Sequence, residues 1–144
     1  MPDPRSFDSG PIEGFLALDV FAVAGVSSNE QKFGTQVFRD LRRAGRRVYG
    51  LNPRLASLDG ETIYPDLASL PERPQVLVLV VPAPIGLNLV EEAARLGIKR
   101  VWMQPGAENE ELLARCSQLG LQTVHGQCVM IELAARRVGR PGSR

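Results

Sequence analysis

Five short apolar runs, separated by stretches with helical spacing, dominate the pattern of hydrophobic and polar residues in this chain. The runs are Val20–Val26, Arg47–Leu51, Gln75–Val81, Arg100–Gln104 and Leu121–His125. A short apolar run bounded by turn residues is typical of a strand covered on both faces, as in a parallel sheet. We therefore predict five buried strands.

Apolar residues between these runs recur at helical intervals. Phe33, Val37, Leu41 and Ala44 are spaced four, four and three residues apart, which predicts one buried stripe of a helix. The same reasoning predicts a leading helix over Pro11–Leu18, a helix from Pro84 with Leu87, Val90 and Ala94 facing inward, a helix over Glu108–Leu119 and a terminal helix over Cys128–Arg137.

Single glycines mark three helix-to-strand junctions. Gly45, Gly97 and Gly120 each follow the end of a predicted helix, and two or three residues separate each of them from the β-branched residues of the next strand. Such short turns, repeated three times, indicate right-handed βαβ units. We predict a single-domain, doubly wound α/β fold, with a parallel sheet of about five strands and helices on both faces. A flavodoxin-like strand order is the alternative, because strand order cannot be read from one sequence.

The segment Asn52–Pro74 interrupts this alternation. It contains no strong long helix, but IYPDLASLPE, residues 63–72, predicts a strand end and a short helical turn. Gly60 marks a turn. The predicted organisation is a flexible N-terminus over residues 1–10, one domain over residues 11–137 and a flexible tail over residues 138–144.

Composition narrows the class of protein. The 144 residues suit one domain, and 17 Lys and Arg against 16 Asp and Glu give a net charge of only +1. No overall field therefore favours nucleic acid or anionic lipid. Cys116 and Cys128 are too few for a disulfide scaffold and match no metal spacing. Without a membrane-length apolar run or a hydrophobic signal core, we expect a cytoplasmic protein with no metal, membrane or nucleic-acid partner.

Four loops rich in Gly, Pro, Ser or Asn follow the first four predicted strands. They are Gly25–Lys32, Asn52–Arg54, Pro82–Pro84 and Gln104–Gly106. Ordinary turns favour the same residue types. Ligands of open parallel sheets, however, bind outside the carboxyl ends of the strands. Four such loops at one edge therefore favour a ligand site.

The first loop has the chemistry of a phosphate site. Gly25 allows close approach of the backbone, Ser27 and Ser28 carry hydroxyls, and Lys32 adds a positive charge before a helix N-terminus. Gly25 and Gly34 are too far apart for the G-x-G-x-x-G spacing of an NAD site. The loop predicts binding of phosphate groups without predicting NAD.

The second loop also differs from an NAD site. NAD sites place an Asp or Glu at the end of the second strand, where it binds the ribose diol. Here that strand ends in YGLNPR, with Asn52 and Arg54 instead. Arg54 suits an additional phosphate on the adenosine ribose, which NADP carries at the 2′ position and CoA at the 3′ position. The residues alone leave both ligands open.

A family resemblance separates them. VAGVSSNEQKFG, VYGLNPR, VVPAP, GIKRVWMQPGAENEE and CVMIE, in this order, resemble the small stand-alone CoA-binding proteins. These are similar to the N-terminal Rossmann-like domain of the succinyl-CoA synthetase α subunit. The resemblance covers about Phe15 to Leu133 and implies a Rossmann-like fold with coenzyme A or an acyl-CoA as the ligand.

The resemblance also implies site residues, position by position. The matching positions are Gly25, Val26, Ser27 and Ser28 in the first loop, with Lys32 just after them, Asn52 and Pro53 in the second, Val81, Pro82 and Ala83 in the third, and Gln104 and Gly106 in the fourth. The first loop would hold the CoA diphosphate, and the third would lie against the adenosine. The fourth would form a wall for the pantetheine arm. The role of Arg54 beside the 3′-phosphate is inferred from its charge.

No catalytic constellation is recognisable. The synthetase works through a phosphorylated histidine in a second domain and a nucleotide-binding β subunit, and this sequence matches neither. We interpret His125, the single histidine, as structural, and Cys128 as either a buried residue or a thiol near the ligand. We predict a non-catalytic CoA or acyl-CoA binding protein. The alternatives are a CoA-binding component of an acyl-CoA ligase or transferase that needs a partner chain, and an NADP- or NAD-binding redox regulator.

Overall fold

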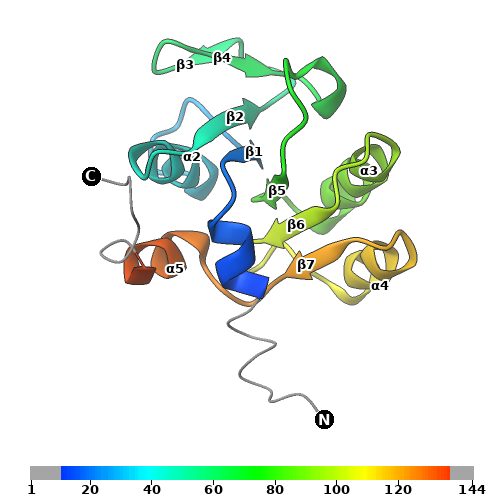
Figure 1. The fold of residues 1–144 in the computed structure, drawn as a ribbon. Helices are drawn as coiled ribbons and strands as arrows, with labels where there is room; N and C mark the ends of the chain where they lie inside the picture. The colour runs from blue at the N-terminus through cyan, green and yellow to red at the C-terminus, as the bar shows by residue number, and fades with distance from the viewer. Residues whose placement is uncertain (1–10, 137–144) are drawn as a thin grey trace.

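The computed structural model describes residues 11–136, whose strands form one sheet with the order β3-β4-β2-β1-β5-β6-β7 (Figure 1). The strands are β1 (Val20–Ala24), β2 (Arg47–Leu51), β3 (Ser57–Leu58), β4 (Glu61–Tyr64), β5 (Val76–Leu79), β6 (Arg100–Met103) and β7 (Gln122–Val124). All neighbours pair in parallel except β3 and β4. Numbered without β3, the order is 3-2-1-4-5-6, the Rossmann order, and not the flavodoxin-like alternative.

Helices cover both faces of this sheet (Figure 1). One face carries α2 (Phe33–Arg43), α5 (Val129–Arg136) and the leading helix at residues 11–16. The other face carries α3 (Ala83–Arg95), α4 (Glu110–Gln118) and the 3₁₀ helix η1 (Leu67–Ser69). Alternate residues of β1 enter the two cores, which explains its unbroken apolar run.

The sheet has two strands more than predicted. β3 and β4 form a hairpin whose two-residue turn, Asp59–Gly60, has φ values of 55° and 76°, as a type I′ turn requires. In β4 only Ile63 is buried, so this strand has no apolar run in the sequence. The predicted strand end and helical turn within residues 63–72 are confirmed by β4 and η1.

The predicted helix-end glycines are confirmed, whereas two predicted inner-face residues of the helices are wrong. The glycines expected at helix ends, Gly45, Gly97 and Gly120, all have positive φ. Phe33, expected on the inner stripe of α2, is 63% exposed because the buried face of that helix begins one residue later, at Gly34. The inner face of α3 contains Ala93, not the predicted Ala94.

The predicted flexible ends, at residues 1–10 and 138–144, lie outside the described residues. The predicted C-terminal residue of the last helix, Arg137, also lies outside them. Within residues 11–136, no helix combines the length and hydropathy needed to cross a membrane.

Candidate functional site

The carboxyl ends of four strands surround a cavity of about 340 Å³. β1 lies between β2 and β5, so the strand order reverses there, and ligands of such sheets bind at this point. The lining residues are Ala24, Gly25, Leu51, Asn52, Pro53, Pro65, Val81, Ile85, Asn88, Leu89 and Glu92. An apolar cleft with a few polar groups at its edge suits a flat aromatic base.

Two glycines bring the first loop against its neighbours. Gly25 has a φ of 109°, and a Cβ there would lie 2.3 Å from the Val80 carbonyl oxygen. A Cβ on Gly34 would lie 2.1 Å from the Gly25 carbonyl oxygen. Gly25 and Gly34 do not have G-x-G-x-x-G spacing, but they allow the same close packing of strand, loop and helix that the glycines of that motif allow.

Hydrogen bonds shape the loop between these glycines. The Ser27 N–H donates to Thr35 Oγ1 at 3.0 Å, and the Thr35 hydroxyl donates to the Ser27 carbonyl at 2.7 Å. The Asn29 N–H donates to Ser27 Oγ at 3.1 Å. These bonds connect Ser27 to Asn29 within the loop and to Thr35 in the first turn of α2.

The N-terminus of α2 faces this loop and suits an anion. Lys32 occupies the N-cap position, where its side chain makes no capping hydrogen bond, and the first turn contains no acidic residue. The N–H groups of a first turn have no partner within the helix, and the helix dipole adds partial positive charge. Lys32 is exposed and makes no ion pair with any residue in 11–136. Phosphate is the ligand chemistry that this end of α2 fits.

Asn52 links the first loop to the second. Its Nδ2 donates to the Val26 carbonyl at 2.7 Å, and its Oδ1 accepts from the Arg54 N–H at 2.7 Å. Both the nitrogen and the oxygen of this amide therefore bond to backbone groups. The side chain does not resemble the carboxylate that binds a ribose diol in NAD sites. Arg54 is exposed, and within residues 11–136 its guanidinium forms no ion pair.

A second cavity, of about 330 Å³, adjoins the first at Val81. Its lining is Val80, Val81, Pro82, Gln104, Pro105, Gly106 and Ala107. Thus the third and fourth predicted loops lie together, as expected from their strands. The Gln104 side chain is largely committed elsewhere: Oε1 accepts from the Val129 N–H at 2.7 Å, and Nε2 donates to Cys128 Sγ at 3.4 Å.

The structure thus distributes the predicted site residues unequally. Gly25, Asn52, Pro53 and Val81 line the first cavity, and Pro82, Gln104 and Gly106 join Val81 at the second. Ser27, Ser28, Lys32 and Arg54 lie on the adjoining loops, outside both linings.

Two predicted positions have buried side chains. Val26 is 0% exposed and Ala83 is 8% exposed, so only their backbones are available to a ligand. The role of all these residues in binding stays a prediction.

One face of α3 was missed by the sequence analysis. Ile85, Asn88, Leu89 and Glu92 line the first cavity at i, i+3, i+4 and i+7, the spacing that could have revealed them. The Glu92 carboxylate also accepts hydrogen bonds from the Leu67 and Ala68 N–H groups, at 3.3 and 3.2 Å.

His125, Cys116 and Cys128 line neither cavity, although Cys128 contacts Gln104 of the second. His125 is exposed just after β7. Cys116 belongs to the core, where burial raises its pKa to about 11. Cys128 is partly exposed and lies just before α5, which begins one residue later than predicted. Within residues 11–136, no three His, Cys, Asp or Glu side chains are arranged to hold a metal ion.

Comparison with known proteins identifies the family. Residues 19–134 match the CoA binding domain family, so the chain belongs to it. The ADP-forming acetate–CoA ligase I of Archaeoglobus fulgidus is 28% identical over 120 residues, which cover 76% of this chain and 18% of the ligase. The chain therefore spans about a fifth of that relative's length.

Solved structures of similar size have the same fold. A conserved hypothetical protein from Pyrococcus furiosus is 35% identical, with a TM-score of 0.76, and the match covers 80% of this chain and 99% of that one. A hypothetical protein from Pyrococcus horikoshii is 27% identical, with a TM-score of 0.84 and coverage of 94% and 98%. The predicted resemblance to stand-alone proteins with a CoA-binding Rossmann-like domain is confirmed.

Proposed function

We propose that this protein binds CoA or an acyl-CoA and catalyses no reaction by itself. The adenine would occupy the cavity between β1, β2 and α3, with the diphosphate at the Gly25–Lys32 loop. The pantetheine arm would follow the second cavity past Gly106. The observation that carries the proposal is the junction of an apolar cleft with an uncapped helix N-terminus at the strand reversal.

The Asn52–Arg54 loop favours CoA over NAD. The residue at this strand end is Asn52, which has no carboxylate to bind a ribose diol, and its amide already links two loops. Arg54 adds an exposed guanidinium, which matches the oxygens of a ribose phosphate. NADP remains the alternative with the same charge requirement, and the matched family supports CoA.

A second candidate function is a component of an acyl-CoA ligase. The ADP-forming acetate–CoA ligase relative supports it, because the match covers only 18% of that enzyme. A ligase built on this chain would therefore need further parts from a partner. An assay with acetate, ATP and CoA distinguishes the two proposals. We expect no ADP formation from this protein alone; turnover that appears on adding a separate partner chain would favour the ligase component.

We expect CoA, but not NAD, to stabilise the fold. A ligand at about 100 times its dissociation constant adds roughly 2.7 kcal/mol to the free energy of unfolding. For a domain of this size, the melting temperature should rise by about 5–10 °C. Differential scanning fluorimetry with CoA, NAD and NADP measures this shift. An equal or larger shift with NAD would overturn the CoA assignment, and one with NADP would favour the redox regulator.

Arg54 should distinguish CoA from 3′-dephospho-CoA. If its guanidinium binds the 3′-phosphate, wild-type protein should prefer CoA by about 1.5–3 kcal/mol, the range for a hydrogen bond to a charged group. Arg54→Ala should lose this preference while binding dephospho-CoA as wild type does. Calorimetric titration of both ligands against both proteins provides the test. A mutant that keeps the full preference would show that Arg54 is a surface residue only.

The acyl state of the ligand requires a separate measurement. Mass spectrometry of small molecules released from protein purified without added ligand should detect CoA or one of its thioesters. Recovery of a dinucleotide in their place would contradict the proposal.

A further inference from the structure

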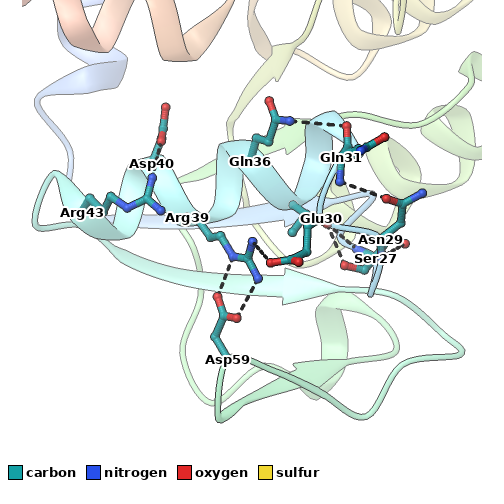
Figure 2. Close-up of polar contacts among 10 residues, drawn as sticks. Ser27, Asn29, Glu30, Gln31, Gln36, Arg39, Asp40, Arg43 and Asp59 are labelled. Atoms are coloured by element: carbon teal, nitrogen blue, oxygen red, sulfur yellow. Dashed lines mark hydrogen bonds and ion pairs between the residues drawn. The ribbon is translucent and has the colours of Figure 1, made fainter.

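Arg39 lies in the middle of α2 and contacts two segments that are distant in sequence (Figure 2). Its Nε and Nη2 donate to the two carboxylate oxygens of Asp59, both at 2.8 Å. Its Nη1 donates to Glu30 Oε1 at 3.1 Å. Glu30 belongs to the Gly25–Lys32 loop and Asp59 to the tip of the β3–β4 hairpin. One guanidinium therefore joins the loop to the hairpin.

The hairpin turn places Asp59 for this contact. Its φ of 55° is a left-handed conformation that Asp tolerates better than most residues, and Gly60 follows with a φ of 76°. The bidentate pair with Arg39 holds the pKa of the Asp59 carboxyl below its ordinary value. The Arg39 side chain is only 21% exposed, whereas that of Arg43, on the same helix, is 73% exposed.

The neighbouring arginines do not form an anion site with Arg39. A cavity of about 360 Å³ lies among Arg39, Arg42, Arg43 and Asp59. However, Arg42 pairs with Glu61 at 3.2 Å and Arg43 with Asp40 at 3.0 Å. Because each cation has an acidic partner, this network is suited to linking segments and not to attracting a phosphate.

Asn52 makes a separate link, between the first loop and the Asn52–Arg54 loop that precedes the hairpin. It connects the Val26 carbonyl in the first loop to the Arg54 N–H, where the chain leaves β2 toward the hairpin. The first loop is thus joined to the Asn52–Arg54 loop by Asn52, and to the hairpin that follows this loop by Arg39.

We propose that Arg39 is a positioning residue for nucleotide binding. By tying Glu30 to Asp59 of the hairpin, it holds in place the Gly25–Lys32 loop, where the diphosphate of CoA would bind. A loop that is ordered before binding loses less conformational entropy when the ligand arrives, so the affinity is higher. This inference rests on the proposed function, because it assigns Arg39 an effect on that same site.

Arg39→Gln tests the inference, with Arg43→Gln as the matched control. Arg43 is on the same helix, and its ion pair with Asp40 contacts neither loop nor hairpin. We expect Arg39→Gln to raise the Kd for CoA about fivefold, the upper end for an accessible ion pair, and Arg43→Gln to leave it unchanged. Glu30→Gln and Asp59→Asn should each show part of the increase, and neither should add to Arg39→Gln.

Hydrogen–deuterium exchange of the unliganded protein distinguishes a local effect of Arg39 on the loop and hairpin from a general effect on stability. In Arg39→Gln, exchange should accelerate at residues 27–32 and 57–61 while the amides of β1 and β5 keep their protection.

Three results would overturn the inference: unchanged exchange at these two segments, faster exchange throughout the sheet, or an unchanged Kd for CoA. If wild-type protein does not bind CoA, the proposed function fails. The exchange data still show in that case whether Arg39 orders the loop.

Discussion

Gly34→Ala should lower the free energy of unfolding by about 3 kcal/mol, at the upper end of overpacking costs, and should abolish measurable CoA binding. The new Cβ would lie 2.1 Å from the Gly25 carbonyl oxygen and 2.5 Å from its carbon. Both contacts are with backbone atoms, so no side-chain rotation relieves them. The first turn of α2 must move away from the loop, which separates the helix N–H groups from the bound phosphates.

Gly14→Ala is the matched control for this change. Gly14 also lies in a helix, but a Cβ there would meet no atom within 4 Å. Alanine is preferred over glycine inside helices, so this variant should be as stable as wild type or slightly more so. Urea denaturation and calorimetric titration with CoA measure both effects. A Gly34→Ala protein with wild-type stability and affinity would show that the close contact is not needed.

The sequence was sufficient for the fold class because burial on both faces leaves a local signal. β1 and β5 are apolar at every position, and the glycines at helix ends have the positive φ that their spacing predicted. Strand order leaves no such signal, since it depends on which buried strands pair. Only the end of β4 was predicted, for a related reason: this strand lies near the sheet edge, and only Ile63 is buried there.

The candidate site could be predicted where it depends on strand ends, and not where it depends on packing between elements. Gly25, Asn52 and Val81 lie at or just after the ends of predicted strands, and the structure brings them to one cavity. Asn88 and Glu92 reach the same cavity only because α3 packs beside the strand reversal. The contact between Gly34 and the Gly25 carbonyl similarly joins residues nine positions apart, at a spacing that matches no short motif.

Ser27→Asp should weaken CoA binding about 100-fold, or roughly 2.7 kcal/mol, with little change in stability. Two like charges 4 Å apart near a protein surface repel by about 4 kcal/mol, and the new carboxylate would face the diphosphate. The loop itself should persist. The Asn29 N–H now donates to Ser27 Oγ, and an aspartate oxygen can accept in its place, while the bond from the Ser27 backbone to Thr35 is unaffected.

Ser27→Asn separates this repulsion from the change in side-chain size. Asparagine offers the same acceptor to the Asn29 N–H without a negative charge, so its affinity for CoA should stay within about threefold of wild type. The deficit of Ser27→Asp should also shrink as salt is raised from 0.05 to about 0.5 M, because ions screen exposed charges. Calorimetric titrations at both salt concentrations, with melting temperatures of the unliganded proteins, measure these effects. Unchanged affinity in Ser27→Asp would place the diphosphate away from this loop, whereas equal losses in both variants would assign the effect to loop shape and not to charge.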